Sequence, residues 1–197
     1  MENVELTKRF LLVEGDQIDI STEDKYIIGT YALASCIGFV LHSKDMKKAI
    51  VGHVSSGQLM HNEQVSNLSF QLSTLLEQGD LRDVPLDLII IEGAFPSTYV
   101  IHSYDLEILD IFGKSTYTLP EVLEEIIKKT DHTNVVSTRF NNDKVSTNEV
   151  HVVDDCMGYS YMDKSKQFAF DTKSGTFVTD KVYFGKEYFE INNSNIK

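Results

Sequence analysis

Two apolar runs joined by a polar turn decide the fold of this chain: Cys36-Ile-Gly-Phe-Val-Leu41 and Ala49-Ile-Val-Gly-His-Val54, separated by Ser43-Lys-Asp-Met-Lys47. Valine, isoleucine and phenylalanine favour strands, and both runs are shorter than an ordinary helix. The lysines and the aspartate between them suit a chain reversal at the surface. The pattern therefore predicts a hairpin of two largely buried antiparallel strands.

A further strand and two helices follow from the same kind of periodicity. The uninterrupted apolar run Leu86–Ile91 is typical of a strand at the centre of a sheet that is covered on both faces. Apolar residues at helical spacing predict amphipathic helices over Glu63–Gln78 and Leu119–Lys129. The second helix is expected to begin after Thr118, because Thr118 and Glu121 have the spacing of a capping box.

The rest of the chain is predicted to be mostly strand. The remaining predicted strands are Phe10–Val13, Tyr26–Gly29, Val135–Arg139, Val150–Val153, Gln167–Asp171, Phe177–Thr179 and Val182–Phe184. A turn is expected at Gly15-Asp16, between the first two of them. This order predicts an α/β (α+β) protein with mixed, mostly antiparallel β-sheets packed as a sandwich with a few flanking helices. It does not match a doubly wound parallel fold.

Length and composition predict one soluble domain. The chain has 197 residues, 42% of them hydrophobic, with only three prolines and no repeat or linker-like tract. We therefore expect a single domain over residues 1–197, with a polar tail at about 191–197. The two cysteines, Cys36 and Cys156, are too few for a disulfide scaffold and favour a reducing compartment.

Charge narrows the classes of partner. The net charge is -12, and lysines and arginines are not clustered in the sequence. These features exclude binding to nucleic acid and disfavour binding to an anionic membrane surface. No apolar run is long enough for membrane insertion, and the first residues do not resemble a signal peptide. These observations predict a cytoplasmic protein, with secretion into a host by a non-classical route as the alternative.

The hairpin suggests a site of cysteine chemistry. Cys36 starts one strand and His53 ends the other, so antiparallel pairing places them at the same end of the sheet. An adjacent imidazole can activate a thiol by forming a thiolate–imidazolium pair. Thr30 lies six positions before Cys36 and could orient the histidine ring. A buried, purely structural cysteine and histidine are the plainer interpretation of the same two residues.

Serines flank both candidate residues. Ser35 is small and leaves the backbone N–H groups near Cys36 open to a developing oxyanion, so we assign it to substrate binding. Ser55 and Ser56 follow His53 and could line a substrate groove, although an ordinary polar loop explains them equally well.

Other titratable residues point to no second site. Cys156 follows His151 and Asp155, but this is not a recognisable zinc pattern, so we expect no metal and a structural cysteine. Three histidines in polar, turn-like contexts are expected to be solvated: His42, His61 and His132.

The motif Thr30-x-x-Leu33-x-Ser35-Cys36, with His53 seventeen positions after the cysteine, resembles the CheD family of bacterial protein-glutamine deamidases that act on chemotaxis receptors. Two further segments resemble the same family, namely the strand that leads to Gly93-Ala94 and the hairpin Phe170–Val178. The wider fold includes deamidase toxins of the cytotoxic necrotizing factor and Burkholderia lethal factor type. The segment Glu92–Tyr99 is similar to a piece of the latter.

The resemblance implies a protein-glutamine deamidase that uses Cys36, His53 and Thr30 without a cofactor or metal. Its partner would be a target protein that carries a reactive glutamine. The sequence departs from the family pattern in two places: Ala34 replaces a glycine, and no Leu-Pro follows His53. A catalytically inactive, CheD-like protein-binding module is therefore an alternative. A toxin- or effector-type deamidase or transglutaminase that acts on a host protein, or an enzyme that cleaves an amide bond, remains a further alternative.

Overall fold

The predicted hairpin lies at the middle of a five-stranded sheet. In the computed structural model, which describes residues 9–93, 100–102, 105–107, 114–140, 146–154 and 159–178, the strands β4 (Ile37–Ser43) and β5 (Lys48–Val54) pair antiparallel. The strand β6 (Pro85–Glu92) lies on the other side of β4, as the apolar run predicted. The edges of this sheet are β2 (Gln17–Ile20) and β9 (Asn134–Phe140).

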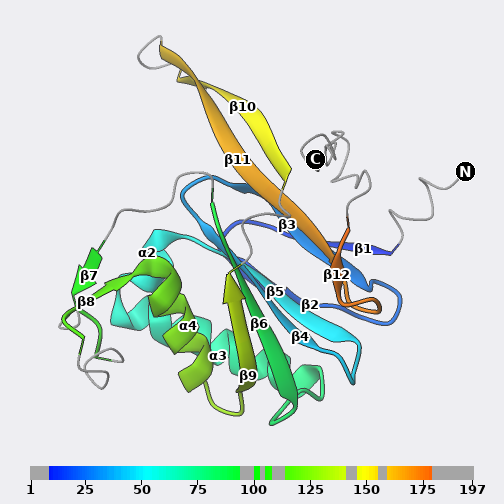
Figure 1. Ribbon diagram of the computed structural model, residues 1–197. Helices are drawn as coiled ribbons and strands as arrows, with labels where there is room; N and C mark the ends of the chain where they lie inside the picture. Colours follow the sequence, from blue (N-terminus) through cyan, green and yellow to red (C-terminus); the bar gives the residue numbers. More distant parts are fainter. Residues whose placement is uncertain are drawn as a thin grey trace, which may run out of the picture.

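A second sheet packs on one face of the first (Figure 1). Its main path runs from β1 (Phe10–Val13) through β3 (Ile27–Leu33) and β11 (Tyr159–Asp171) to β10 (Ser146–Asp154). The short β12 (Thr176–Phe177) pairs with β11, and β7 (Val100–His102) pairs with β8 (Thr116–Thr118) as a separate ribbon. Most pairings are antiparallel, while β1–β3 and β6–β9 are parallel. The predicted fold class is confirmed.

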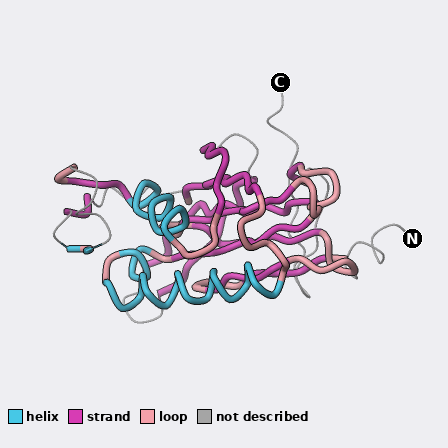
Figure 2. Tube along the Cα trace, turned by 90° about the horizontal axis from the view of Figure 1, so that it is seen from below, coloured by secondary structure: helices cyan, strands magenta, loops and turns pink. Residues whose placement is uncertain are grey.

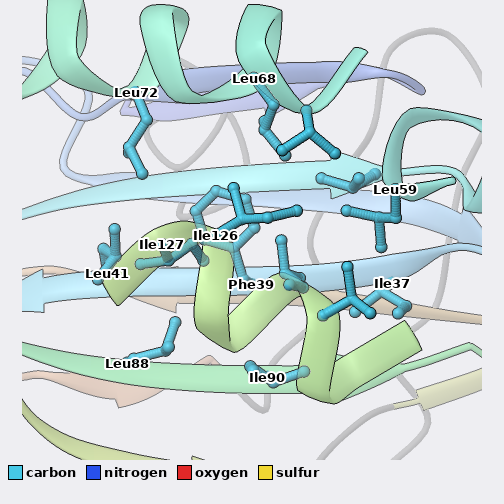
Figure 3. Packing of buried hydrophobic residues seen from close by; sticks show 14 of the residues in the cluster. Ile37, Phe39, Leu41, Leu59, Leu68, Leu72, Leu88, Ile90, Ile126 and Ile127 are labelled. Carbon is cyan, nitrogen blue, oxygen red and sulfur yellow. The ribbon is translucent and has the colours of Figure 1, made fainter. Parts of the chain in front are cut away.

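Helices cover the other face of the hairpin sheet. They are α2 (Ser56–Leu59), α3 (Asn62–Gln78) and α4 (Leu119–Lys129), and Figure 2 shows α3 running alongside the strands. Side chains of α3 and α4, among them Leu72 and Ile126, point toward Phe39 and Leu41 of β4 (Figure 3). Burial of this apolar area, at about 25 cal/mol per Å², holds the helices on the sheet.

Alternation along β4 and β5 produces two separate cores. Phe39 and Leu41 face the helices, whereas Val40 faces the second sheet, where it packs with Phe168 and Phe170 of β11. Because successive strand residues point to opposite faces, a strand buried on both sides reads as a continuous apolar run. The two cores account for the unbroken hydrophobicity of the hairpin.

The predicted turn at Gly15-Asp16 is present, and a strand that was not predicted follows it. Phe10–Val13 is a strand as expected, but Gly15-Asp16 leads into β2, which the sequence did not reveal, and not into β3. The strands β1 and β3 lie parallel in one sheet, while β2 pairs antiparallel with β5 in the other. The chain therefore crosses between the sheets at this turn. A four-residue strand with two isoleucines carries too little periodicity to be recognised from sequence.

His42 is not solvated, in contrast to the expectation. Its side chain is only 4% exposed, and its Nε2 lies 3.0 Å from the carbonyl oxygen of Thr172. The ring packs edge-on against Phe170. The polar turn after His42 suggested a surface position, but β12 and the turn before it cover that end of the sheet. His61 and His132 are exposed as predicted.

Several predictions fall on residues outside the described ranges. They concern the strand Val182–Phe184, the tail 191–197, Cys156 and residues 94–99 of the toxin-like segment. The single-domain boundary 1–197 stays a prediction. Among the described residues, no helix is both long and apolar enough to cross a bilayer.

Candidate cysteine–histidine site

His53 lies near the end of β5, on the face that packs against the second sheet. Its backbone partners are Gln17 of β2 on one side and Gly38 of β4 on the other. Its side chain is only 4% exposed. Because residues directly opposite one another in a ladder share a face, the missing side chain of Gly38 leaves room beside the imidazole, which Phe168 partly fills. The ring thus projects into the space between the sheets.

Thr30 comes from the opposite sheet and contacts the histidine directly. Its Oγ1 lies 2.9 Å from Nδ1 of His53 and donates to the carbonyl oxygen of Val13 at 2.7 Å. A hydroxyl has one proton to donate, and here that proton goes to Val13. Nδ1 must therefore carry the hydrogen that Thr30 accepts. This assignment leaves a lone pair on Nε2, the atom that a general base uses.

Cys36 sits in a tight turn that connects β3 to β4. Ala32 has a left-handed φ of 57°, and the N–H of Ala34 bonds to the carbonyl of Ala32 at 2.9 Å. The N–H of Gly93 holds the turn from the other side by donating to the carbonyl of Cys36 at 3.0 Å. A Cβ at Gly93 would stand 2.2 Å from the carbonyl oxygen of Ala34, so only glycine allows this close approach.

The thiol and the imidazole occupy the same side of the hairpin. Cys36 is two residues before Gly38, the backbone partner of His53, so strand alternation puts both side chains on one face. Cys36 is half-buried and packs against the core between the sheets. No hydrogen bond joins Cys36 to Nε2 of His53 within the described part of the chain. Such contacts are often long without substrate and shorten in the reactive complex.

Burial favours the neutral forms of both groups. Desolvation raises the pKa of the Cys36 thiol, the charge of Asp16 raises it further, and a hydrogen bond from Ser35 opposes them. Desolvation lowers the pKa of His53, with Asp16 acting in the opposite direction. The expected thiolate–imidazolium pair is therefore disfavoured in the resting protein. A neutral thiol whose proton moves to the histidine during attack fits the site better.

Ser35, Ser55 and Ser56 differ in their relation to the site. Ser35 is exposed beside Cys36, and neither its N–H nor that of Cys36 donates to a backbone carbonyl among the residues described. Ser55 precedes the first turn of α2 and Ser56 begins it, so the predicted polar loop is a short helix. The side chain of Ser55 makes no capping bond. Only Ser35 adjoins the thiol in sequence.

Asp16 and Gly93 belong to the site, although sequence reasoning assigned them no role in it. Asp16 was predicted only as a turn residue, and Gly93 only as part of a family-like segment. No local pattern identifies either one, because Asp16 reaches the site through the pairing of β2 with β5 and Gly93 through the pairing of β6 with β4. Among the described residues, no group of three or more His, Cys, Asp or Glu side chains could hold a metal ion.

Comparisons with known proteins leave the family open. No protein-family model matches the sequence, and no curated protein matches it. Among experimentally determined structures, a similar one is that of the hypothetical protein YfiH of Bacillus licheniformis. The similarity has a TM-score of 0.41 and 9% identity, and it covers 62% of this chain and 49% of that protein. At that score it supports no inference about function, and the CheD resemblance stays a prediction.

Proposed function

We propose that this protein is a cysteine-dependent protein-glutamine deamidase with Cys36 as nucleophile and His53 as base. The observation that carries the proposal is the buried hydrogen-bond chain from Nδ1 of His53 through Thr30 to Val13. This chain selects the imidazole tautomer whose Nε2 can accept a proton, on the face where the Cys36 side chain lies. In nucleophilic catalysis a third group commonly orients the base toward the nucleophile, as Thr30 orients His53 here.

The proposed reaction has two halves. In the first, the sulfur of Cys36 attacks the side-chain carbonyl carbon of a glutamine while the thiol proton passes to Nε2 of His53. The carbon–nitrogen bond then breaks, and His53 returns the proton to the leaving nitrogen, which departs as ammonia. In the second half, His53 takes a proton from water, the hydroxide attacks the thioester, and the proton returns to the sulfur. The products are a glutamate side chain and free Cys36.

The turn around Cys36 supplies candidates for oxyanion stabilisation. The N–H groups of Ser35 and Cys36 have no backbone acceptor in the described chain and flank the attacking sulfur. Such donors stabilise the negative oxygen of the tetrahedral intermediate, and loss of one typically costs about 10²–10³ in rate. The left-handed Ala32 and the Gly93 contact hold this turn in one conformation.

Labelled water provides the test. The full chain is incubated in H₂¹⁸O with soluble extracts of bacterial and of host cells, and peptides are searched for glutamine converted to glutamate. Hydrolysis of a thioester adds one solvent oxygen, so a modified glutamine gains about 3 Da instead of about 1 Da. We expect the gain with the natural protein and with Cys156→Ala, and none with Cys36→Ala or His53→Gln. A chemoreceptor target would appear in the bacterial extract and an effector target in the host extract.

Two controls separate the alternatives. His42→Gln changes another buried histidine on the same face of the same sheet, distant from Cys36, and should stay active. Incorporation of an added primary amine at the glutamine would indicate transglutamination. The absence of labelled glutamate from both extracts, together with a Cys36 that is inert to iodoacetamide, would contradict the proposal and favour a protein-binding module.

A further inference from the structure

The turn between β1 and β2 holds a carboxylate against the end of β5. Asp16 immediately precedes Gln17, the backbone partner of His53. Its Oδ1 accepts a hydrogen bond from the backbone N–H of Ser55 at 3.1 Å, and its backbone carbonyl oxygen accepts one from Nε2 of Gln58, also at 3.1 Å. Since Ser55 is two residues after His53, these bonds tie Asp16 to the segment that carries the imidazole.

The backbone of the turn places Asp16 in the left-handed region. Asp16 has a left-handed φ of 59°, whereas a Cβ on the neighbouring Gly15 would meet nothing within 4 Å. A turn that needed only the left-handed conformation would favour glycine at position 16, since aspartate and asparagine are tolerated there at some cost. The left-handed backbone therefore does not by itself require the carboxylate of Asp16, whose hydrogen bond to Ser55 is a separate feature.

The charge of Asp16 acts on both reactive groups. It raises the pKa of His53, against the effect of burial, and it raises the pKa of Cys36. The other elements packed around the ring present uncharged residues, namely Gln17, Thr30 and Gly38. Two further charged residues, Glu92 opposite Ile37 and Lys166 opposite Leu33, attract each other. Among the residues that the structure describes, Asp16 is therefore the charged side chain that acts on the imidazole.

We propose that Asp16 is a positioning residue of this site, fixing the segment after His53 through the Ser55 amide and stabilising the positive charge that His53 gains when it removes the thiol proton. The catalytic meaning of this inference rests on the proposed function. Asp16 does not need to touch the substrate, because it acts through the imidazole. Asp16 is exposed, so water screens part of its charge, but the buried imidazole is less shielded than a group in bulk water and its protonated form is still favoured.

Asp16→Asn separates the charge from the hydrogen bond. Asparagine tolerates the left-handed backbone, and its carbonyl oxygen can still accept the Ser55 N–H, so only the charge is lost. Asp80→Asn is the matched control, because Asp80 is also an exposed aspartate with a left-handed φ, of 56°. Asp80 follows Gly79, whose carbonyl accepts from Lys48 at the opposite end of β5 from His53.

Two titrations of the full chain give the readout. NMR follows the ring of His53, assigned with His53→Gln, and peptide mass spectrometry follows the rate of Cys36 alkylation by iodoacetamide against pH. Removal of a negative charge lowers the pKa of a thiol and of an imidazole alike. We therefore expect both midpoints to move to lower pH in Asp16→Asn and to stay in place in Asp80→Asn.

The outcomes distinguish this inference from the proposed function. Unchanged midpoints in Asp16→Asn, or equal shifts in both variants, would overturn the inference whether or not the protein deamidates glutamine. Shifted midpoints in a protein without deamidase activity would support the role of Asp16 and reject the reaction. Amide exchange at Ser55 provides the second measurement. The exchange should remain slow in Asp16→Asn and become faster in Asp16→Ala. If the exchange stays slow in both variants, the positioning role is contradicted.

Discussion

At the scale of single residues, Thr30 has the clearest role, since one hydroxyl satisfies two buried partners. It accepts from Nδ1 of His53 and donates to the carbonyl of Val13, and it is fully buried. Water does not replace a lost partner at such a position, and the cost of an unpaired buried polar group is about 1–3 kcal/mol. The same hydroxyl decides which nitrogen of the ring is free.

Replacement of Thr30 by valine keeps the shape and removes the hydroxyl. We expect Thr30→Val to lose about 1–3 kcal/mol of unfolding free energy. Deamidase activity should also fall, because the ring can adopt the other tautomer. Urea denaturation and initial rates measure the two effects. Thr130→Val is the matched control, since Thr130 is a buried threonine that donates to Ile126 in α4. It should lose stability without loss of activity, and Thr30→Ser should retain both.

Two buried histidines predict a loss of stability in mild acid. Desolvation lowers the pKa of His42 and of His53 in the folded protein, while the unfolded chain titrates near about 6.5. The unfolded state therefore binds more protons below that pH, and the folded state is stabilised above it. We expect the urea midpoint to be constant above about pH 7 and to decrease as the pH falls below about 6.5.

The variant His42→Gln tests how much of this acid dependence comes from His42. In His42→Gln the decrease in midpoint between about pH 6.5 and 5 should be smaller, because one of the two groups no longer titrates. His61→Gln is the control, since His61 is exposed. An identical acid dependence in His42→Gln and the natural protein would show that His42 does not contribute.

At the scale of elements, the turn from β3 to β4 is shaped by what packs around it. Between the pairs Thr30–Phe168 and Leu33–Lys166, β3 contains one residue more than β11. An extra residue of this kind bends a strand and redirects the next side chains, and such bulges are common beside active sites. The left-handed Ala32 lies inside the bulge. The bulge and the Gly93 contact together orient Cys36.

Gly93→Ala tests the importance of this contact. The added methyl group would stand 2.2 Å from the carbonyl oxygen of Ala34 and 2.7 Å from that of Cys36, so the turn must move. We expect activity to fall by about 10²-fold or more, because small displacements of reacting groups have effects of that size. Initial rates and Cys36 alkylation measure it. Gly57→Ala, whose methyl group would meet only Ser55 at 3.8 Å, should remain active.

At the scale of the whole molecule, the site depends on how the two sheets pack. Thr30 belongs to one sheet, whereas His53 and Gly38 belong to the other. Phe168 lies between them, fully buried, with its ring where a side chain on Gly38 would be. The core between the sheets therefore sets the separation across which Thr30 reaches the imidazole. Loss of packing there should affect both stability and the site.

Phe168→Ala is expected to destabilise the protein by about 3–5 kcal/mol, the usual cost of removing a buried aromatic ring. It should also weaken the Thr30–His53 contact, seen as a change in the NMR signal of the His53 ring. Phe70→Ala is the matched control, because Phe70 is 74% exposed on α3, and its effect should stay within about 0.5 kcal/mol. Equal midpoints for the two variants in urea would contradict this view of the core.

Local pattern predicted much of the framework. The hairpin, the central strand β6 and the helices α3 and α4 were recognisable because each has several turns or strand residues of consistent periodicity. The positions of Cys36 and His53 at one end of the hairpin followed from antiparallel pairing alone. Their chemical role remains a prediction.

The sequence by itself determined the hairpin, the strand β6, the helices α3 and α4, the mixed sandwich class and the approximate place of the thiol and imidazole, since these depend on neighbouring residues. Only the tertiary structure decided that His42 is buried against Thr172, 130 residues away, and that Thr30 bonds to His53 across two sheets. It alone brought Asp16 to the end of β5. The physical reason is that burial and hydrogen-bond partners depend on long-range packing, which local periodicity does not encode.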